Sequence, residues 1–209
     1  MKEKVSISFL LLAITFCVCL IAANLLGIKI IQIGNFAVSA GLLVFPISYI
    51  INDCLTEVWG FKKARIVIFT AFLMNIFIVL IGLIVVYIPS SPFWNGNEHF
   101  AYVFNIAPRT TIGSLLAFLS GSLLNAFVMN KMKTLNNGKY FSFRAIVSTI
   151  VGEGIDSVIF FPIAFLGIIG FQELLMMILA QVILKTLYEI LILPITIRSV
   201  KKLKQIEGI

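Results

Sequence analysis

Three pairs of ionisable side chains lie inside long apolar runs of this sequence. The members of each pair are three or four residues apart: Asp53 with Glu57, Glu153 with Asp156, and Lys185 with Glu189. These spacings place both members on one face of a helix. An ionisable group near the centre of a bilayer costs roughly 2.5–3.5 kcal/mol on insertion scales, so such groups normally face a protein interior and have a role. We therefore expect the three pairs to converge on a shared polar interior that can bind a ligand.

Each pair also has a purely structural interpretation. The pair near the C-terminus could be an ion pair within its own helix, and the first pair could lie at the cytoplasmic interface beside Lys62 or Arg65. The middle pair is harder to explain in this way, because the apolar residues 150–151 and 158–161 flank Asp156 on both sides. We therefore expect Asp156 to have a functional role.

The composition places these pairs in a membrane protein. Of the 209 residues, 60% are hydrophobic and 12% are charged, whereas a soluble domain is about 45–50% apolar and about 25% charged. Backbone groups in hydrocarbon must be satisfied by helices or closed barrels, and the apolar runs here are long and continuous, as helices require. The sequence thus predicts an all-α, polytopic membrane protein.

Six apolar runs can form transmembrane helices, each of which needs about 20 residues. We expect a single domain over residues 1–209 with a bundle of six spans at about 5–27, 38–59, 64–88, 111–129, 145–168 and 174–197. The first run is longer than the apolar region of a signal peptide, about 7–15 residues, so we expect a retained helix. The second run reaches span length only if its helix continues through Asp53 to Trp59.

The basic residues predict the orientation of the six spans. Thirteen of the 16 lysines and arginines lie before the first run, between the second and third, between the fourth and fifth, and after the sixth. Cytoplasmic connections carry an excess of Lys and Arg, so we expect both termini in the cytoplasm and the chain in the cell (inner) membrane. The net charge of +7 is explained by these clusters, and we expect no nucleic-acid partner because no basic domain is present.

Several kinds of chemistry have no support in the sequence. Cys17, Cys19 and Cys54 are an odd number of cysteines in apolar surroundings, without the spacing of a disulfide framework or a metal site. No G-x-x-x-x-G-K-[ST] phosphate loop is present. The only histidine, His99, lies in the expected external connection at 89–108. We therefore expect no cofactor, no metal and no catalytic residue, and not an enzyme.

Three prolines fall inside the expected helices that carry the charged pairs. Pro46, Pro162 and Pro194 each remove a backbone hydrogen bond and free a carbonyl one turn earlier. Kinked helices around a polar pocket are common in transporters. The alternative is that the prolines only adjust packing between helices.

An ordered set of short motifs runs through the membrane region from about Asn24 to Thr196. The motifs are Ala23-Asn24, Phe45-Pro46, Asp53, Trp59-Gly60, Ala64-Arg65, Arg109-Thr110, Ser148-Thr149, Asp156, Ile163-Ala164-Phe165, Lys185 and Pro194. With them the chain resembles the queuosine precursor transporter family, which is related to vitamin-uptake membrane proteins. Two positions depart from the family pattern: Asn125 stands where an aspartate is frequent, and Glu153 stands where an amide is common. Both departures bear on which precursor is preferred.

The resemblance implies import of 7-deazaguanine bases, such as 7-cyano-7-deazaguanine, 7-aminomethyl-7-deazaguanine or queuine, which supply a modified tRNA base. The candidate substrate-binding residues are Asn24, Asp53, Glu57, Arg109, Glu153, Asp156, Lys185 and Glu189. A guanine-like edge presents N–H donors in pairs that a carboxylate can accept, so Asp156 or Asp53 is expected at that edge. Arg109, Lys185 and Asn24 could contact the carbonyl oxygen or hold the carboxylates. The acidic excess would suit a cationic aminomethyl substrate or a carried proton.

Other functions remain open at this point. The chain could be the substrate-binding subunit of an ATP-driven uptake system, and an energy-coupling partner or an oligomer is compatible with the sequence. An intramembrane protease would need two aspartates, for which Asp53 and Asp156 are available. A purely structural role would leave the buried charges without an explanation.

Overall fold

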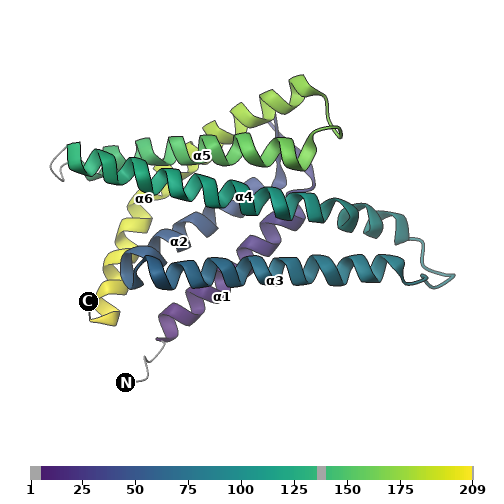
Figure 1. Cartoon of the computed structure of the whole chain (residues 1–209), viewed down its shortest axis with the longest axis horizontal. Helices are drawn as coiled ribbons and strands as arrows, with labels where there is room; N and C mark the ends of the chain where they lie inside the picture. The colour runs from purple at the N-terminus through teal and green to yellow at the C-terminus, as the bar shows by residue number, and fades with distance from the viewer. Residues whose placement is uncertain (1–5, 136–139, 209) are drawn as a thin grey trace.

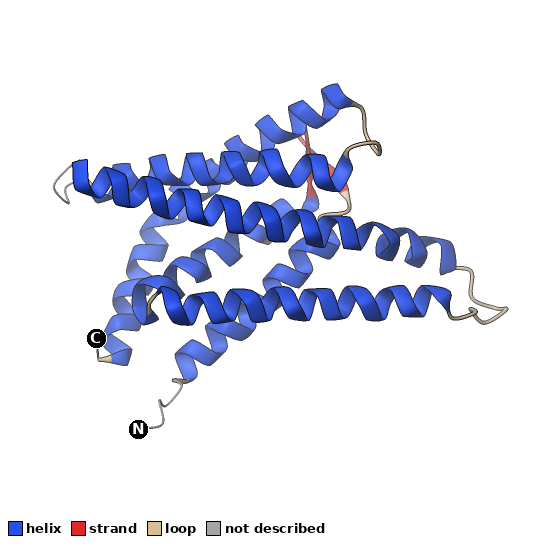
Figure 2. Cartoon of the chain, in the orientation of Figure 1, coloured by secondary structure: helices blue, strands red, loops and turns tan. Residues whose placement is uncertain are grey.

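The computed structural model describes residues 6–135 and 140–208. These residues form six α-helices, a two-stranded antiparallel hairpin and one short 3-10 helix (Figures 1 and 2). The elements are α1 Ile7–Leu26, β1 Ile30–Ile33, β2 Phe36–Ser39, η1 Ala40–Leu43, α2 Phe45–Trp59, α3 Phe61–Tyr87, α4 Asn97–Leu135, α5 Phe141–Phe165 and α6 Phe171–Glu207. The start of α1, the end of α6, the α2–α3 connection and the facing ends of α4 and α5 all lie at one end of the bundle (Figure 1).

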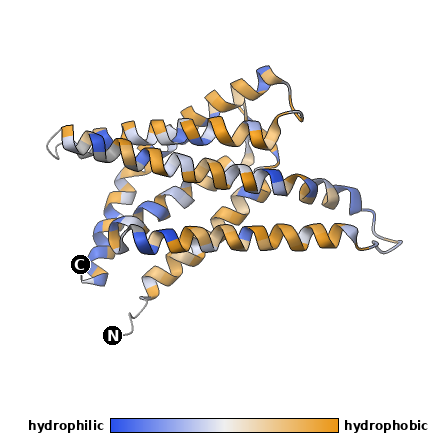
Figure 3. Cartoon of the chain, viewed as in Figure 1, coloured by the Kyte–Doolittle hydropathy of each residue, from blue (hydrophilic) through white to orange (hydrophobic). Residues whose placement is uncertain are grey.

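Several of these helices suit a bilayer. Four segments are long and apolar enough to cross a membrane: Ile7–Leu26, Lys62–Tyr87, Ile146–Phe165 and Phe171–Glu207. Figure 3 shows long hydrophobic stretches along the helices, with hydrophilic residues gathered mainly toward their ends. Many large apolar side chains on the outer faces are exposed, as a lipid-facing surface requires. The chain is therefore a helical, multi-pass membrane protein.

The predicted start of the second helix was wrong. A helix was expected over 38–59, but α2 begins at Phe45, and the residues before it form η1 and the hairpin. Gly34 adopts a positive φ of 59° in the two-residue connection between β1 and β2, which a tight hairpin turn requires. Pro46 lies in the first turn of α2, where its missing N–H is not needed, so it starts this helix rather than kinking it.

The hairpin is fixed to the end of α1 and to α6. The Ser39 hydroxyl donates to the Gly27 carbonyl at 2.8 Å, and the Ala40 amide donates to the Lys29 carbonyl at 2.8 Å. Val38 packs in a buried apolar cluster that also contains residues of η1 and α6. These contacts bury part of an irregular segment inside the protein, which is the condition for tolerating it at membrane depth.

Two other predicted boundaries differ from the structure. The fourth helix was expected over 111–129, after a loop at 89–108, but α4 spans 39 residues from Asn97 to Leu135 and contains Pro108. The turn-like residues near Gly96 and Pro108 favour a loop. Neither feature prevents a helix when neighbouring helices support it. The last helix was expected to end at 197, and it continues to Glu207 through a run of basic residues.

The helix packing divides into two main apolar clusters. Phe16, Leu20, Leu55, Phe72 and Phe118 belong to the larger one, which joins α1, α2, α3 and α4. A second cluster joins α5 to the start of α6. Helices α4 and α5 run side by side (Figure 1). Helix α6 packs against both α2 and α5, so the charged residues of these three helices lie close together.

Candidate functional site

The ammonium group of Lys185 lies at the centre of the charged cluster. Its Nζ atom is 2.6 Å from Oδ2 of Asp156 and 2.8 Å from Oε2 of Glu153. Lys185 comes from the middle of α6, and both acids come from one face of the middle of α5. The three residues are 5%, 2% and 4% exposed in the order Lys185, Asp156, Glu153. The cluster is therefore a buried ion triad between two helices.

The start of α2 supplies an aromatic wall to this triad. The Lys185 Nζ lies 4.5 Å from the centre of the Phe45 ring and 5.9 Å from that of Tyr49, both within cation–π range. The Tyr49 hydroxyl donates a hydrogen bond of 3.3 Å to Oδ1 of Asp156. A buried ion pair is stable only when further hydrogen bonds satisfy its remaining atoms. Tyr49 provides such a bond, so α2, α5 and α6 hold the triad together.

A cavity opens beside the triad between these same helices. The space between its lining side chains, its open mouth included, is about 380 Å³. The residues that line it are Pro46, Tyr49, Ile50, Asp53, Glu153, Lys185, Tyr188, Glu189, Leu193 and Thr196. Asp53 is exposed in this cavity. The cavity thus combines apolar and aromatic walls with convergent charged groups, as small-molecule sites do.

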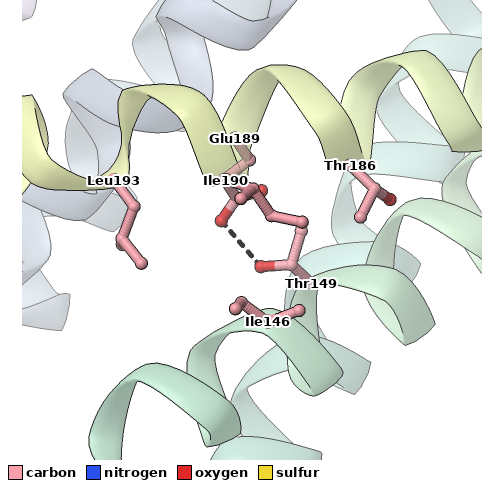
Figure 4. Close-up of a pocket in the computed structure, with 6 residues that line it drawn as sticks. All are labelled: Ile146, Thr149, Thr186, Glu189, Ile190 and Leu193. Carbon is pink, nitrogen blue, oxygen red and sulfur yellow. Dashed lines mark hydrogen bonds between the residues drawn. The ribbon is translucent and has the colours of Figure 1, made fainter.

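Glu189 takes part in a second contact between α5 and α6. Its Oε1 atom accepts a hydrogen bond of 2.7 Å from the Thr149 hydroxyl. Figure 4 shows this bond in a smaller hollow of about 220 Å³, lined by Ile146, Thr149, Thr186, Glu189, Ile190 and Leu193. Glu189 lines both spaces. The ion pair within α6 that was the structural alternative is not formed, because Lys185 turns to the acids of α5 instead.

Five of the eight predicted site residues are brought together here. Asp53, Glu153, Lys185 and Glu189 line the cavity, and Asp156 lies behind Lys185. In formal terms the site carries four carboxylates and one ammonium group. Such a site can accept paired N–H donors and can offer one N–H donor of its own. It is acidic overall.

The other three predicted residues lie elsewhere. Glu57 is exposed and pairs with Lys204 near the end of α6, rather than with Lys62 or Arg65. Arg109 donates from Nε to the Ile163 carbonyl at 3.1 Å and from Nη2 to the Leu166 carbonyl at 2.9 Å. It thereby satisfies carbonyls at the end of α5 that have no partner within the helix. Asn24 is buried in α1, away from the cavity lining.

The aromatic residues of the site were not among the predicted site residues. Tyr49 lies four residues before Asp53, and Tyr188 lies three residues after Lys185. Those spacings place each tyrosine on the same helix face as its charged neighbour, so the signal was present. Phe45 had been noted only as part of a motif, and its contact with Lys185 depends on the packing of α2 against α6.

Comparison with known proteins adds a family and several relatives. A model of the family described as "Putative vitamin uptake transporter" matches residues 39–199. A protein of Bacillus subtilis (strain 168) named "Probable queuosine precursor transporter" is 25% identical over 177 residues, covering 83% of this chain and 76% of that protein. No solved structure matches significantly.

Two further relatives carry related names. The "Queuosine precursor transporter" of Escherichia coli (strain K12) is 25% identical over 139 residues, covering 65% of this chain. A "Probable queuosine precursor transporter" of Haemophilus influenzae is 28% identical over 135 residues, covering 63% of this chain. The aligned parts span 58% and 53% of these two relatives. The family match at 39–199 contains the whole cavity lining but not Asn24.

Proposed function

This chain belongs to the vitamin uptake transporter family, and from that premise we propose that it imports 7-deazaguanine precursors of queuosine. The substrate class includes 7-cyano-7-deazaguanine, 7-aminomethyl-7-deazaguanine and queuine. The observation that carries the proposal is the cavity beside the buried triad of Lys185, Glu153 and Asp156. Charged groups inside membrane helices are costly, and they usually mark a ligand site or a transport pathway.

The proposed mode of binding follows from the cavity lining. Carboxylates of the cavity lining accept N–H donors of the base, and Lys185 donates to the carbonyl oxygen. Tyr49 and Tyr188 stack on the flat ring, an interaction worth roughly 1–3 kcal/mol per base in nucleic-acid binders. Asp156 acts through Lys185 and Tyr49, which it holds in place. Glu57 and Arg109 bind partners outside the cavity, and Asn24 lies outside its lining.

The proposed topology has six passes in the cell membrane, with both termini in the cytoplasm. Its support is the concentration of basic residues in alternating connections and the position of the first and last helix ends at the same end of the bundle (Figure 1). Helix α2 has 15 residues and a length of about 22 Å, short of a bilayer core of about 30 Å. The hairpin and η1 complete this pass.

A protease with two catalytic aspartates fits the site less well. Such a dyad shares a proton between two adjacent carboxylates. Asp156 is instead bound to Lys185 and Tyr49, and its carboxylate is committed to those partners. In the proposed carrier, the contacts of Asp156 with Lys185 and Tyr49 position the binding site, and no second free carboxylate is needed beside Asp156.

Restoration of queuosine in tRNA by an externally supplied precursor tests the proposed function. The gene is expressed in a cell that lacks both synthesis of the precursors and its own importer, and queuosine in tRNA is measured at low external base. Wild type should restore the modification. Asp156→Asn should insert into the membrane but fail to restore it, because the amide weakens the hold on Lys185. The matched control is Glu173→Gln, which removes an exposed carboxylate in the first turn of α6 and should behave as wild type.

Failure of the wild-type gene with every base would refute the proposal. Full activity of Asp156→Asn would remove that residue from the mechanism. Uptake by the purified protein alone in lipid vesicles then separates a self-sufficient carrier from the binding subunit of an ATP-driven system.

A further inference from the structure

The carboxylates that face the cavity outnumber the cations that the protein supplies. Among the described residues that line the cavity, Lys185 is the only basic one, and two carboxylates of α5 already share its ammonium group. Asp53 and Glu189 are the other two carboxylates that line the cavity. Within residues 6–135 and 140–208, neither of them forms an ion pair, and Glu189 accepts only the Thr149 hydroxyl. With every group in its ionised form, the cavity lining therefore has more negative than positive charge.

Uncompensated carboxylates between membrane helices are costly, and a cation in the cavity would reduce that cost. We propose that the ligand itself supplies this cation, so that the site selects a flat base with a protonated amine over a neutral base. Within the 7-deazaguanine class, the amine-bearing 7-aminomethyl base is preferred over the neutral 7-cyano base. This inference rests on the proposed function.

Asp53 is the carboxylate best placed to receive the amine. Glu153 and Asp156 are almost completely buried and bound to Lys185, whereas Asp53 is exposed in the cavity. Glu189 lies on the α6 side of the same space. A primary ammonium group has three N–H donors and no acceptor, so it can bind two carboxylates at once. Asp53 and Glu189 thus provide the amine subsite.

The cavity also offers aromatic faces to the same cation. Tyr49 lies one helical turn before Asp53 on α2, and Tyr188 directly precedes Glu189 on α6; both tyrosines line the cavity. Rings of this kind attract a nearby ammonium group and stack on a heterocycle. A nitrile lacks both the charge and the donors, so it gains neither interaction. The selectivity resides in Asp53 and Glu189, while the tyrosines contribute to binding of every base.

A different role for these carboxylates makes a different prediction. If Asp53 carried a coupled proton and did not contact the ligand, its replacement would reduce transport of charged and neutral bases alike. If Asp53 receives the amine, its replacement changes the ratio between the two bases. The ratio is therefore the quantity to measure.

Competition during uptake measures that ratio. Cells expressing the protein take up labelled 7-aminomethyl-7-deazaguanine in the presence of either unlabelled base. In wild type, the 7-cyano base should compete about tenfold or more weakly than the 7-aminomethyl base, as expected for loss of a charge-assisted hydrogen bond. In Asp53→Asn, and to a lesser degree in Glu189→Gln, the two bases should become nearly equal competitors. Glu173→Gln, which lies outside the cavity, should keep the wild-type ratio.

Several results would overturn the inference while leaving the proposed function intact. Equal competition by the two bases in the wild-type protein would by itself overturn the inference. An unchanged ratio in both Asp53→Asn and Glu189→Gln, with reduced uptake of each base, would favour the proton-carrying role instead. If Asp53→Asn fails to insert into the membrane, the competition ratios of wild type and of Glu189→Gln still test the inference. Absence of uptake of every base would refute the proposed function itself.

Discussion

Replacement of Lys185 by methionine tests the buried triad most directly. Methionine keeps much of the volume of the side chain and removes only the ammonium group. The two acid oxygens lie 2.6 and 2.8 Å from Nζ, so they are at most about 5.4 Å apart. At an effective dielectric constant of about 20 their repulsion is then about 3 kcal/mol. This agrees with the roughly 3–5 kcal/mol lost when one partner of a buried ion pair is removed. Lys185→Met should therefore be strongly destabilised and inactive.

The assay is thermal unfolding of the detergent-solubilised protein, followed by size-exclusion chromatography. Lys204→Met is the matched control, because Lys204 belongs to the same helix but pairs with exposed Glu57. The second test is a double variant: Glu153→Gln added to Lys185→Met removes one of the two repelling charges and should recover part of the lost stability without restoring uptake. Wild-type stability of Lys185→Met, or a further loss in the double variant, would show that the triad does not hold α5 and α6 together in this way.

Three smaller predictions concern contacts outside the cavity. Gly121→Ala should lower the unfolding temperature, at a cost of about 1–3 kcal/mol, because its Cβ would lie 2.8 Å from the Gly152 carbonyl oxygen; Gly154→Ala, which meets no atom within 4 Å, is the control. Arg109→Ala should cost about 1 kcal/mol, because two carbonyls at the end of α5 lose an exposed donor; an altered ratio between the two bases in this variant would show that Arg109 does affect ligand binding. Lys204→Ala should change the free energy of unfolding by less than about 1 kcal/mol, since its ion pair with Glu57 is exposed; a larger loss in a thermal melt would speak against that assignment.

The membrane class and the presence of a charged interior could be predicted from composition and spacing. Long apolar runs predict helices whatever their neighbours, because backbone groups in lipid have no other partner. The spacing of Glu153 and Asp156 fixed their common helix face, and the structure places both on Lys185. Their confinement to an apolar run indicated in advance that this face is turned inward.

The hairpin and the start of α2 were less accessible to sequence analysis. Residues 38–44 are apolar enough to continue a helix, and a short apolar run has the same appearance in a strand, a 3-10 helix or an α-helix. Gly34 and Pro46 carried the local signals, a left-handed turn and a helix start. The predicted helix nevertheless began at residue 38, because a full-length span was expected there.

The sequence by itself determined which side chains share a helix face, because the helical repeat is a property of one chain segment. Only the tertiary structure decided which faces meet. Lys185 and Glu189 share a face of α6, yet Lys185 binds the acids of α5 and Glu189 binds Thr149. Likewise, Arg109 and Glu57 have the charge of binding residues but find their partners at helix ends. The choice depends on the packing of α2, α5 and α6 through apolar contacts far apart in the sequence, and no local spacing encodes it.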